Sequence, residues 1–83
     1  MSREETADVV RRALASVAPE SENQPIDPDA DFRDQMDIDS MDFLNFIIAV
    51  HEATGIDVPE QDYPQLASLN GCMDYLAARS KKP

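Results

Sequence analysis

Residues 39–50, DSMDFLNFIIAV, combine a helix-start signal with a run that is rich in apolar side chains. Ser40 lies at the expected first turn, where a side-chain oxygen normally caps free backbone N–H groups. Polar or small residues then recur along one narrow stripe of a helix, at Asp42, Asn45, Ala49 and Glu52. The spacing therefore predicts a largely buried helix over about residues 40–54.

The rest of this helix surface is apolar and divides into two lines. The line assigned to the core consists of Phe43, Phe46, Ile47 and Val50. A second line, beside the polar stripe, consists of Met41, Leu44 and Ile48. Because one helix of a small bundle cannot bury its whole circumference, we expect part of the second line to be exposed. Exposed apolar side chains rimmed by carboxylates are typical of a docking surface for partner proteins.

Ser40 lacks the partner that a catalytic serine needs. A nucleophilic serine is activated by a base within hydrogen-bond reach, usually histidine. The chain has a single histidine, His51, which lies about 16 Å further along the same helix at 1.5 Å per residue. A serine enzyme is therefore excluded, and a modified serine at a helix N-terminus, where an anion is favoured, is the better interpretation.

The remaining sequence predicts an all-α fold, a small bundle of three main helices plus one short helix. The first helix covers about residues 3–18, with a Ser2–Glu5 capping box at its start and Pro19 after its end. Residues 19–39 show no periodicity and predict a long loop between helices 1 and 2. Its expected apolar anchors are Ile26, Phe32, Met36 and Ile38.

After the central helix, Gly55 is the expected stop. A short helix is predicted over about residues 61–66, and a last helix, capped by Ser68, over about residues 68–79. Gly71 is expected to weaken the last helix by about 1 kcal/mol relative to alanine. Cations near its C-terminal end, favoured by the helix dipole, are Arg79, Lys81 and Lys82.

Composition limits the classes of partner. The 83 residues predict a single domain, residues 1–83, and 7 basic against 17 acidic residues leave a net charge of -10. This field repels nucleic acid and anionic membranes, so partners should present basic patches. One cysteine allows no internal disulfide, no signal peptide is recognisable, and no apolar stretch approaches the ~20 residues of a membrane span. We expect a soluble, cytoplasmic monomer.

No metal site is predicted. Asp27, Asp29 and Asp31 match positions 1, 3 and 5 of an EF-hand loop, but Phe32 and Ile38 stand where that loop requires glycine and glutamate. The sharp turn and the bidentate ligand are therefore both missing. Only weak, non-specific binding of divalent ions to the carboxylates stays open.

Asp39-Ser40-Met41, preceded by a long loop and followed by an amphipathic helix, resembles the attachment site of acyl carrier proteins. The usual pattern of that family is Gly-x-Asp-Ser-Leu, and the resemblance extends over about residues 3–79. This chain departs from the pattern at Asp37, where glycine is usual, and at Met41, where leucine is usual. Asn45 and His51 stand at positions that are commonly acidic in members serving fatty acid synthesis.

The resemblance implies a non-catalytic carrier with 4′-phosphopantetheine attached covalently to Ser40. The arm would hold acyl intermediates as thioesters for fatty acid, polyketide or related specialised biosynthesis. Implied partners are a phosphopantetheinyl transferase and acyl ligase or synthase enzymes with basic docking patches. The docking residues expected around Ser40 are Asp39, Met41, Asp42, Leu44, Asn45, Ile48 and Glu52. Two alternatives stay open: a peptidyl or aminoacyl carrier, and an acidic helical interaction module in which Ser40 is never modified.

Overall fold

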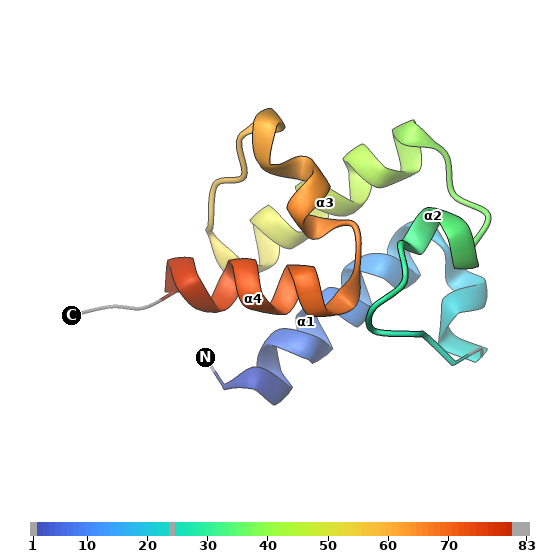
Figure 1. Cartoon of the computed structure of the whole chain (residues 1–83), viewed down its shortest axis with the longest axis horizontal. Helices are drawn as coiled ribbons and strands as arrows, with labels where there is room; N and C mark the ends of the chain where they lie inside the picture. Colours follow the sequence, from blue (N-terminus) through green and yellow to red (C-terminus); the bar gives the residue numbers. More distant parts are fainter. Residues whose placement is uncertain (1, 24, 81–83) are drawn as a thin grey trace.

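The computed structural model describes residues 2–23 and 25–80, and within them it contains helices and turns but no strand. Three long helices make up the bundle: α1 (Arg3–Val17), α3 (Ser40–Thr54) and α4 (Leu69–Ser80). α1 packs against both α3 and α4, and the 3-10 helix η2 (Glu60–Leu66) packs on α4 (Figure 1). The all-α prediction is confirmed.

The predicted loop between the first and the central helix is present, and it contains two short helical segments. A 3-10 helix, η1 (Pro19–Asn23), follows α1 directly, and a single turn, α2 (Phe32–Gln35), comes before α3. Pro19 is compatible with the start of a helix because the missing N–H has no helical partner there. Asp31 caps α2 by accepting from the backbone N–H of Arg33 at 2.8 Å. Segments this short show no hydrophobic period, which is why the sequence did not reveal them.

Local signals explain where the long helices begin and end. The Ser2–Glu5 capping box is present, with Ser2 Oγ accepting from the N–H of Glu5 at 3.1 Å. Gly55 ends α3 with φ of 72°, a left-handed conformation that glycine adopts without steric cost. Ser68 caps α4 by accepting from the N–H of Gly71 at 3.0 Å. Lys81 and Lys82, predicted to complement the end of this helix, lie outside the described residues.

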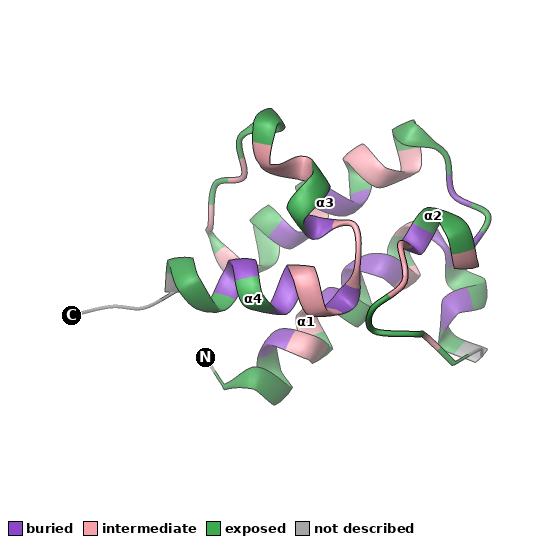
Figure 2. Ribbon diagram, in the orientation of Figure 1, coloured by how far each residue is buried: buried purple, intermediate pink, exposed green. Residues whose placement is uncertain are grey.

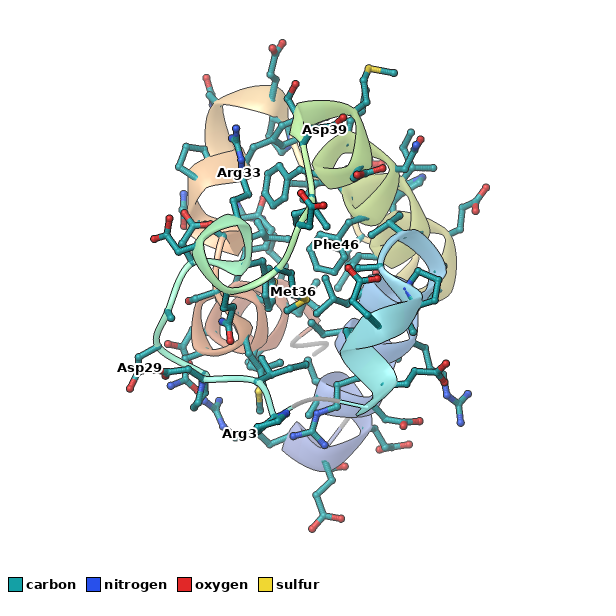
Figure 3. The ribbon with its side chains drawn as sticks, turned by 90° about the vertical axis from the view of Figure 1, so that its right-hand side faces the viewer. Arg3, Asp29, Arg33, Met36, Asp39 and Phe46 are labelled. Carbon is teal, nitrogen blue, oxygen red and sulfur yellow. The ribbon has the colours of Figure 1, made fainter. Side chains whose placement is uncertain are left out.

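The core is formed by apolar faces of the three long helices and by the segment between α1 and α3. Figure 2 shows buried and exposed residues alternating along each long helix. Phe32 and Phe46 are fully buried, with ring centroids 5.4 Å apart in an edge-to-face arrangement. Figure 3 places Met36 and Phe46 in the interior. The predicted loop anchors Phe32, Met36 and Ile38 are buried, and Ile26 is half-buried.

The core assignment within α3 needs one correction. Phe46, Ile47 and Val50 are buried as expected, but Phe43 is only half-buried. Its ring stacks on Phe46, with centroids 5.9 Å apart, and meets Tyr63 edge-on at 6.3 Å. Phe43 therefore lies between the core and the surface, in the gap between α3 and η2.

A second correction concerns Gly71, which was expected to weaken α4 relative to alanine. A Cβ atom at this position would collide with the backbone carbonyl oxygen of Gln65 and would lie 3.0 Å from Ser68 Oγ. Glycine is required because the chain between η2 and α4 passes so close to the helix. Helix propensity alone predicts that alanine at position 71 would stabilise α4, whereas this close contact predicts that it would destabilise the fold.

η2 is held against α4 by a partly buried polar cluster. The carboxylate of Asp62, whose side chain is 15 % exposed, accepts from the hydroxyl of Tyr75 at 2.8 Å and from Arg79 at 3.1 Å. The guanidinium of Arg79 also lies 4.0 Å from the centre of the Tyr75 ring. This cluster fixes η2, which lies opposite the start of α3.

Candidate functional site

The start of α3 is capped by Asp39 and not by Ser40. The carboxylate of Asp39 accepts from the N–H of Asp42 at 2.9 Å, and the carboxylate of Asp42 accepts from the N–H of Asp39 at 3.3 Å. This is a capping box built from two aspartates. Ser40, the first residue of the helix, is left without a capping role.

The Ser40 side chain is exposed, and no hydrogen bond found among the described residues involves its hydroxyl. A serine hydroxyl in this position can be reached from solvent. His51 does not reach it: its Nδ1 lies near the other end of α3, 3.0 Å from the carbonyl oxygen of Ile56 and 3.4 Å from a carboxylate oxygen of Asp57. The hydroxyl is therefore available for modification, but His51 cannot act as its base.

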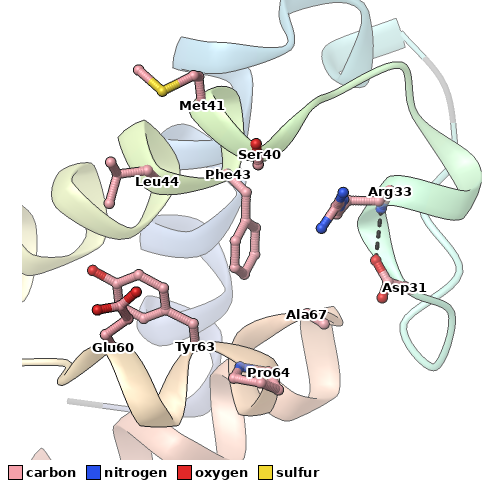
Figure 4. A pocket seen from close by; sticks show the side chains of 10 residues that line it. All are labelled: Asp31, Arg33, Ser40, Met41, Phe43, Leu44, Glu60, Tyr63, Pro64 and Ala67. Carbon is pink, nitrogen blue, oxygen red and sulfur yellow. Dashed lines mark hydrogen bonds between the residues drawn. The ribbon is translucent and has the colours of Figure 1, made fainter.

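A pocket of about 710 Å³ opens beside Ser40, between the start of α3, the segment around α2, and η2 (Figure 4). The side chains that line it come from three separate parts of the sequence. They are Asp31, Arg33, Ser40, Met41, Phe43, Leu44, Glu60, Tyr63, Pro64 and Ala67. The lining combines apolar and aromatic side chains with charged ones, a combination suited to an elongated ligand with both polar and apolar parts.

The structure brings together some of the predicted docking residues and separates others. Met41 and Leu44 line the same pocket as Ser40, whereas Ile48 lines a smaller one of about 350 Å³ with His51 and Val58. Met41 is 63 % and Ile48 45 % exposed, so the second apolar line is open to solvent in part, as expected. Leu44 is half-buried.

The predicted polar docking residues differ in what they contact. Asn45 and Glu52 are exposed on α3. The carboxylates of Asp39 and Asp42 are already engaged with the backbone, so they contribute negative potential at the surface more than free hydrogen-bond acceptors. Both side chains still contribute to the electrostatic field that a partner meets at this end of α3.

Several pocket residues were not predicted as site residues, notably Arg33, Glu60 and Tyr63. They lie at least seven positions from Ser40 in the sequence and follow no shared pattern with it. Only the packing of α2 and η2 against α3 brings them to one place. No local sequence signal could have identified them.

The carboxylates considered for calcium have separate roles. Asp31 caps α2, Asp29 accepts from the side-chain amide of Asn70 at 2.6 Å, and Asp27 accepts from the N–H of Asp29 at 3.0 Å. Within residues 2–23 and 25–80, no group of three or more potential metal ligands is assembled.

The start of α3 fits a covalently bound phosphate ester. The hydroxyl is exposed, the helix behind it is fifteen residues long, and a pocket begins at the same residue. A helix N-terminus favours an anionic substituent, since its free N–H groups and its dipole both present positive charge. These features fit a carrier domain, a class of protein that presents a tethered group to other enzymes.

Comparison with known proteins agrees with this class. Residues 8–76 match the family described as the phosphopantetheine attachment site, and the chain belongs to this family. Members bear 4′-phosphopantetheine, so the predicted family, cofactor and absence of catalytic activity are confirmed.

Curated relatives that carry the name acyl carrier protein match nearly the full chain. The protein from Rubrobacter xylanophilus is 26 % identical over 76 residues, covering 92 % of this chain and 93 % of the relative. The protein from Acidothermus cellulolyticus is 28 % identical over 79 residues, covering 93 % and 90 %. A mitochondrial acyl carrier protein from Saccharomyces cerevisiae is 28 % identical over 71 residues, covering 86 % of this chain and 56 % of the relative. Among the described residues, no helix has the length and hydropathy of a membrane span.

Proposed function

We propose that this chain carries acyl intermediates as thioesters, with 4′-phosphopantetheine joined to the hydroxyl of Ser40 through a phosphodiester. The observation that carries the proposal is the division of roles at the start of α3. Asp39 and Asp42 satisfy the cap, and Ser40 keeps an exposed hydroxyl that forms no internal hydrogen bond among the described residues. The bound group supplies a thiol, which forms thioesters with carboxylic acids.

The names of the relatives favour an acyl cargo over a peptidyl or aminoacyl one. The pocket beside Ser40 also supports an acyl cargo, because its lining includes the apolar residues Met41, Phe43 and Leu44. Fatty acid, polyketide and related specialised biosynthesis remain the proposed contexts. The departures at Asn45 and His51 favour a specialised pathway.

We propose that partner enzymes dock on the face of α3 around Ser40. The exposed side chains of Met41 and Ile48 supply apolar contact. Negative charge comes from Asp39, Asp42 and Glu52, and Leu44 and Asn45 complete this face of α3. The partners are a phosphopantetheinyl transferase and acyl ligase or synthase enzymes with basic patches. Attraction of this kind weakens as salt rises. A cytoplasmic monomer is the form that we propose for these encounters.

Co-expression with a broad-specificity phosphopantetheinyl transferase tests the attachment site. Intact mass should increase by one phosphopantetheinyl group, and Ser40→Ala should abolish the increase. Ser16→Ala, which removes another exposed serine on α1, should leave it unchanged. A mass increase that persists in Ser40→Ala, or none in the wild type, contradicts the proposal.

A thiol count gives an independent measurement. Cys72 is fully buried, so the folded apo protein should offer no thiol to a bulky aromatic disulfide reagent. Attachment of the arm should add one reactive thiol per chain. Incubating the modified protein with fatty acids or amino acids and candidate ligases then separates an acyl carrier from an aminoacyl carrier, because only one class of cargo should consume this thiol.

A further inference from the structure

Within the described residues, some arginines of this acidic chain form ion pairs with carboxylates, and others do not. Three of the described arginines form ion pairs with carboxylates: Arg3 with Asp74 at 3.3 Å, Arg12 with Asp8 at 3.0 Å, and Arg79 with Asp62 at 3.1 Å. Arg11 and Arg33 have no carboxylate partner within the described residues. Of these two, only Arg33 lines the pocket that begins at Ser40.

The position of Arg33 is set by its neighbours. Phe32, the preceding residue, is fully buried and donates its backbone N–H to the carbonyl oxygen of Ala67 at 2.7 Å. The backbone N–H of Arg33 donates to the carboxylate of Asp31 at 2.8 Å. The main chain is therefore anchored on both sides, while the side chain is exposed. Figure 4 shows the guanidinium pointing from α2 into the pocket, toward the side on which Ser40 and Phe43 lie.

A phosphodiester on Ser40 would enter an acidic neighbourhood. Asp37, Asp39 and Asp42 surround the serine in sequence, and the carboxylates of Asp39 and Asp42 occupy backbone N–H groups that could otherwise bind an anion. Repulsion from these carboxylates weakens the attraction that the helix dipole and the remaining free N–H groups exert on the phosphate. A guanidinium can offset this repulsion, since its planar set of N–H donors matches the oxygens of a phosphate ester.

We propose that Arg33 is the positioning residue for the prosthetic group: its guanidinium pairs with the phosphodiester on Ser40 and directs the beginning of the arm across the pocket. The inference rests on the proposed attachment at Ser40. It assigns a role to the one cation that lines this pocket among the described residues. The arm of the carrier at rest then lies over the gap between α3 and η2 for part of the time instead of extending freely into solvent.

The test compares the apo and fully modified forms of three variants and of the wild type. Arg33→Gln removes the charge, and Arg33→Lys keeps it without the planar donor set. Arg11→Gln changes the net charge by the same amount on α1 and serves as the matched control. Complete modification of Ser40 is first verified by intact mass for each protein. Two readouts follow: the phosphorus NMR resonance of the phosphodiester during a NaCl titration, and the change in Tm on modification.

At low salt, the phosphorus resonance of Arg33→Gln should differ from that of the wild type, whereas that of Arg11→Gln should not. Rising NaCl should move the wild-type resonance toward the Arg33→Gln position, because the pair is exposed to screening. The docked population should fall about two- to fivefold in Arg33→Gln, as expected for an exposed ion pair, and less in Arg33→Lys. The Tm of the modified form relative to the apo form should fall in Arg33→Gln, fall less in Arg33→Lys, and stay unchanged in Arg11→Gln.

The two proposals can fail separately. If mass shows no modification of Ser40 in the wild type, both fail together. If Ser40 is modified but the resonance and the Tm difference are the same in Arg33→Gln, Arg11→Gln and the wild type, the role of Arg33 is overturned while the attachment site stands. A general loss of stability in Arg33→Gln does not imitate the expected result, because it affects the apo and modified forms alike.

Discussion

Asp39 and Asp42 exchange hydrogen bonds between carboxylate and backbone at the start of α3, at 2.9 Å and 3.3 Å. Ser40 lies between them in the sequence and takes no part in the exchange. Many helices use a serine for this purpose, and its hydroxyl is then occupied. Here two carboxylates satisfy the helix end, which leaves a hydroxyl that an enzyme can reach.

Replacing the cap should loosen the helix start. Asp39→Ala removes the acceptor for the N–H of Asp42, so we expect the free energy of unfolding to fall by about 1 kcal/mol, measured by urea denaturation. Modification of Ser40 by the transferase should also slow, because the first turn frays. Asp37→Ala is the control, because it removes the same charge from an exposed residue that has no hydrogen bond or ion pair among the described residues. The free energy of unfolding of this variant should stay within about 0.5 kcal/mol of the wild type. Equal losses in the two variants would assign the effect to charge and not to the cap.

Gly71 should resist a substitution that helix propensity favours. Gly71→Ala places a Cβ atom against the backbone carbonyl oxygen of Gln65, so we expect a loss of about 1–3 kcal/mol in the free energy of unfolding. Ala78→Gly, at an exposed position of the same helix, should lose about 0.5–1 kcal/mol through propensity alone. A gain of stability in Gly71→Ala would show that the turn between η2 and α4 can move aside.

The free energy of unfolding should fall at alkaline pH because the thiol of Cys72 is buried. Burial raises the pKa of Cys72, whereas an unfolded cysteine titrates near about 8.5. The thiol therefore stays protonated in the folded state but is deprotonated in the unfolded state as pH rises above about 8.5. The stabilisation is complete below this pH and is lost by up to about 1.4 kcal/mol per pH unit above it. Urea denaturation between about pH 8 and pH 10 measures the slope.

Cys72→Ala is the control for this slope. The variant should be less stable at every pH, because it loses the packing of the sulfur and the contact between Sγ and the carbonyl oxygen of Leu66 at 3.1 Å. Between about pH 8 and pH 10 its stability should nevertheless change less than that of the wild type. The pKa of Tyr75 is also raised, by burial and by Asp62, but its effect begins only near about pH 10. Identical slopes in both proteins would rule out the thiol as the source.

Met41 should matter for partners and not for folding. Its side chain is 63 % exposed, so Met41→Gln should leave the free energy of unfolding within about 0.5 kcal/mol of the wild type. If partners dock on this face of α3, kcat/KM for modification should fall about three- to tenfold, the equivalent of roughly 1 kcal/mol of lost apolar contact. Ala53→Ser, on another exposed part of α3, is the control and should leave kcat/KM unchanged. An unchanged kcat/KM in Met41→Gln would remove this residue from the docking surface.

The elements that could be predicted from the sequence are those whose causes are local. The capping box of Ser2 and Glu5, the stop at Gly55 and the cap at Ser68 each depend on residues within four positions of one another. The buried face of α3 follows from the helical period, apart from Phe43. The prediction that Ser40 is modified also depends on a short stretch, residues 37–41, followed by a helix. Hydrogen bonds and side-chain contacts over one or two turns leave a readable pattern because helical geometry places them at fixed spacings.

Other features depended on segments that are far apart in the sequence. The sequence indicates Ser40 as the capping residue, but aspartate is an equally good cap and the backbone conformation at Asp39 selects that residue. The sign of the Gly71 substitution depends on the path of Gln65, and the pocket beside Ser40 depends on Arg33 and Tyr63 being packed against α3. Such contacts have no fixed spacing. They arise because the burial of apolar side chains, here around Phe32 and Phe46, brings separate segments together. The polar groups of those segments then meet where the packing of the shared core places them.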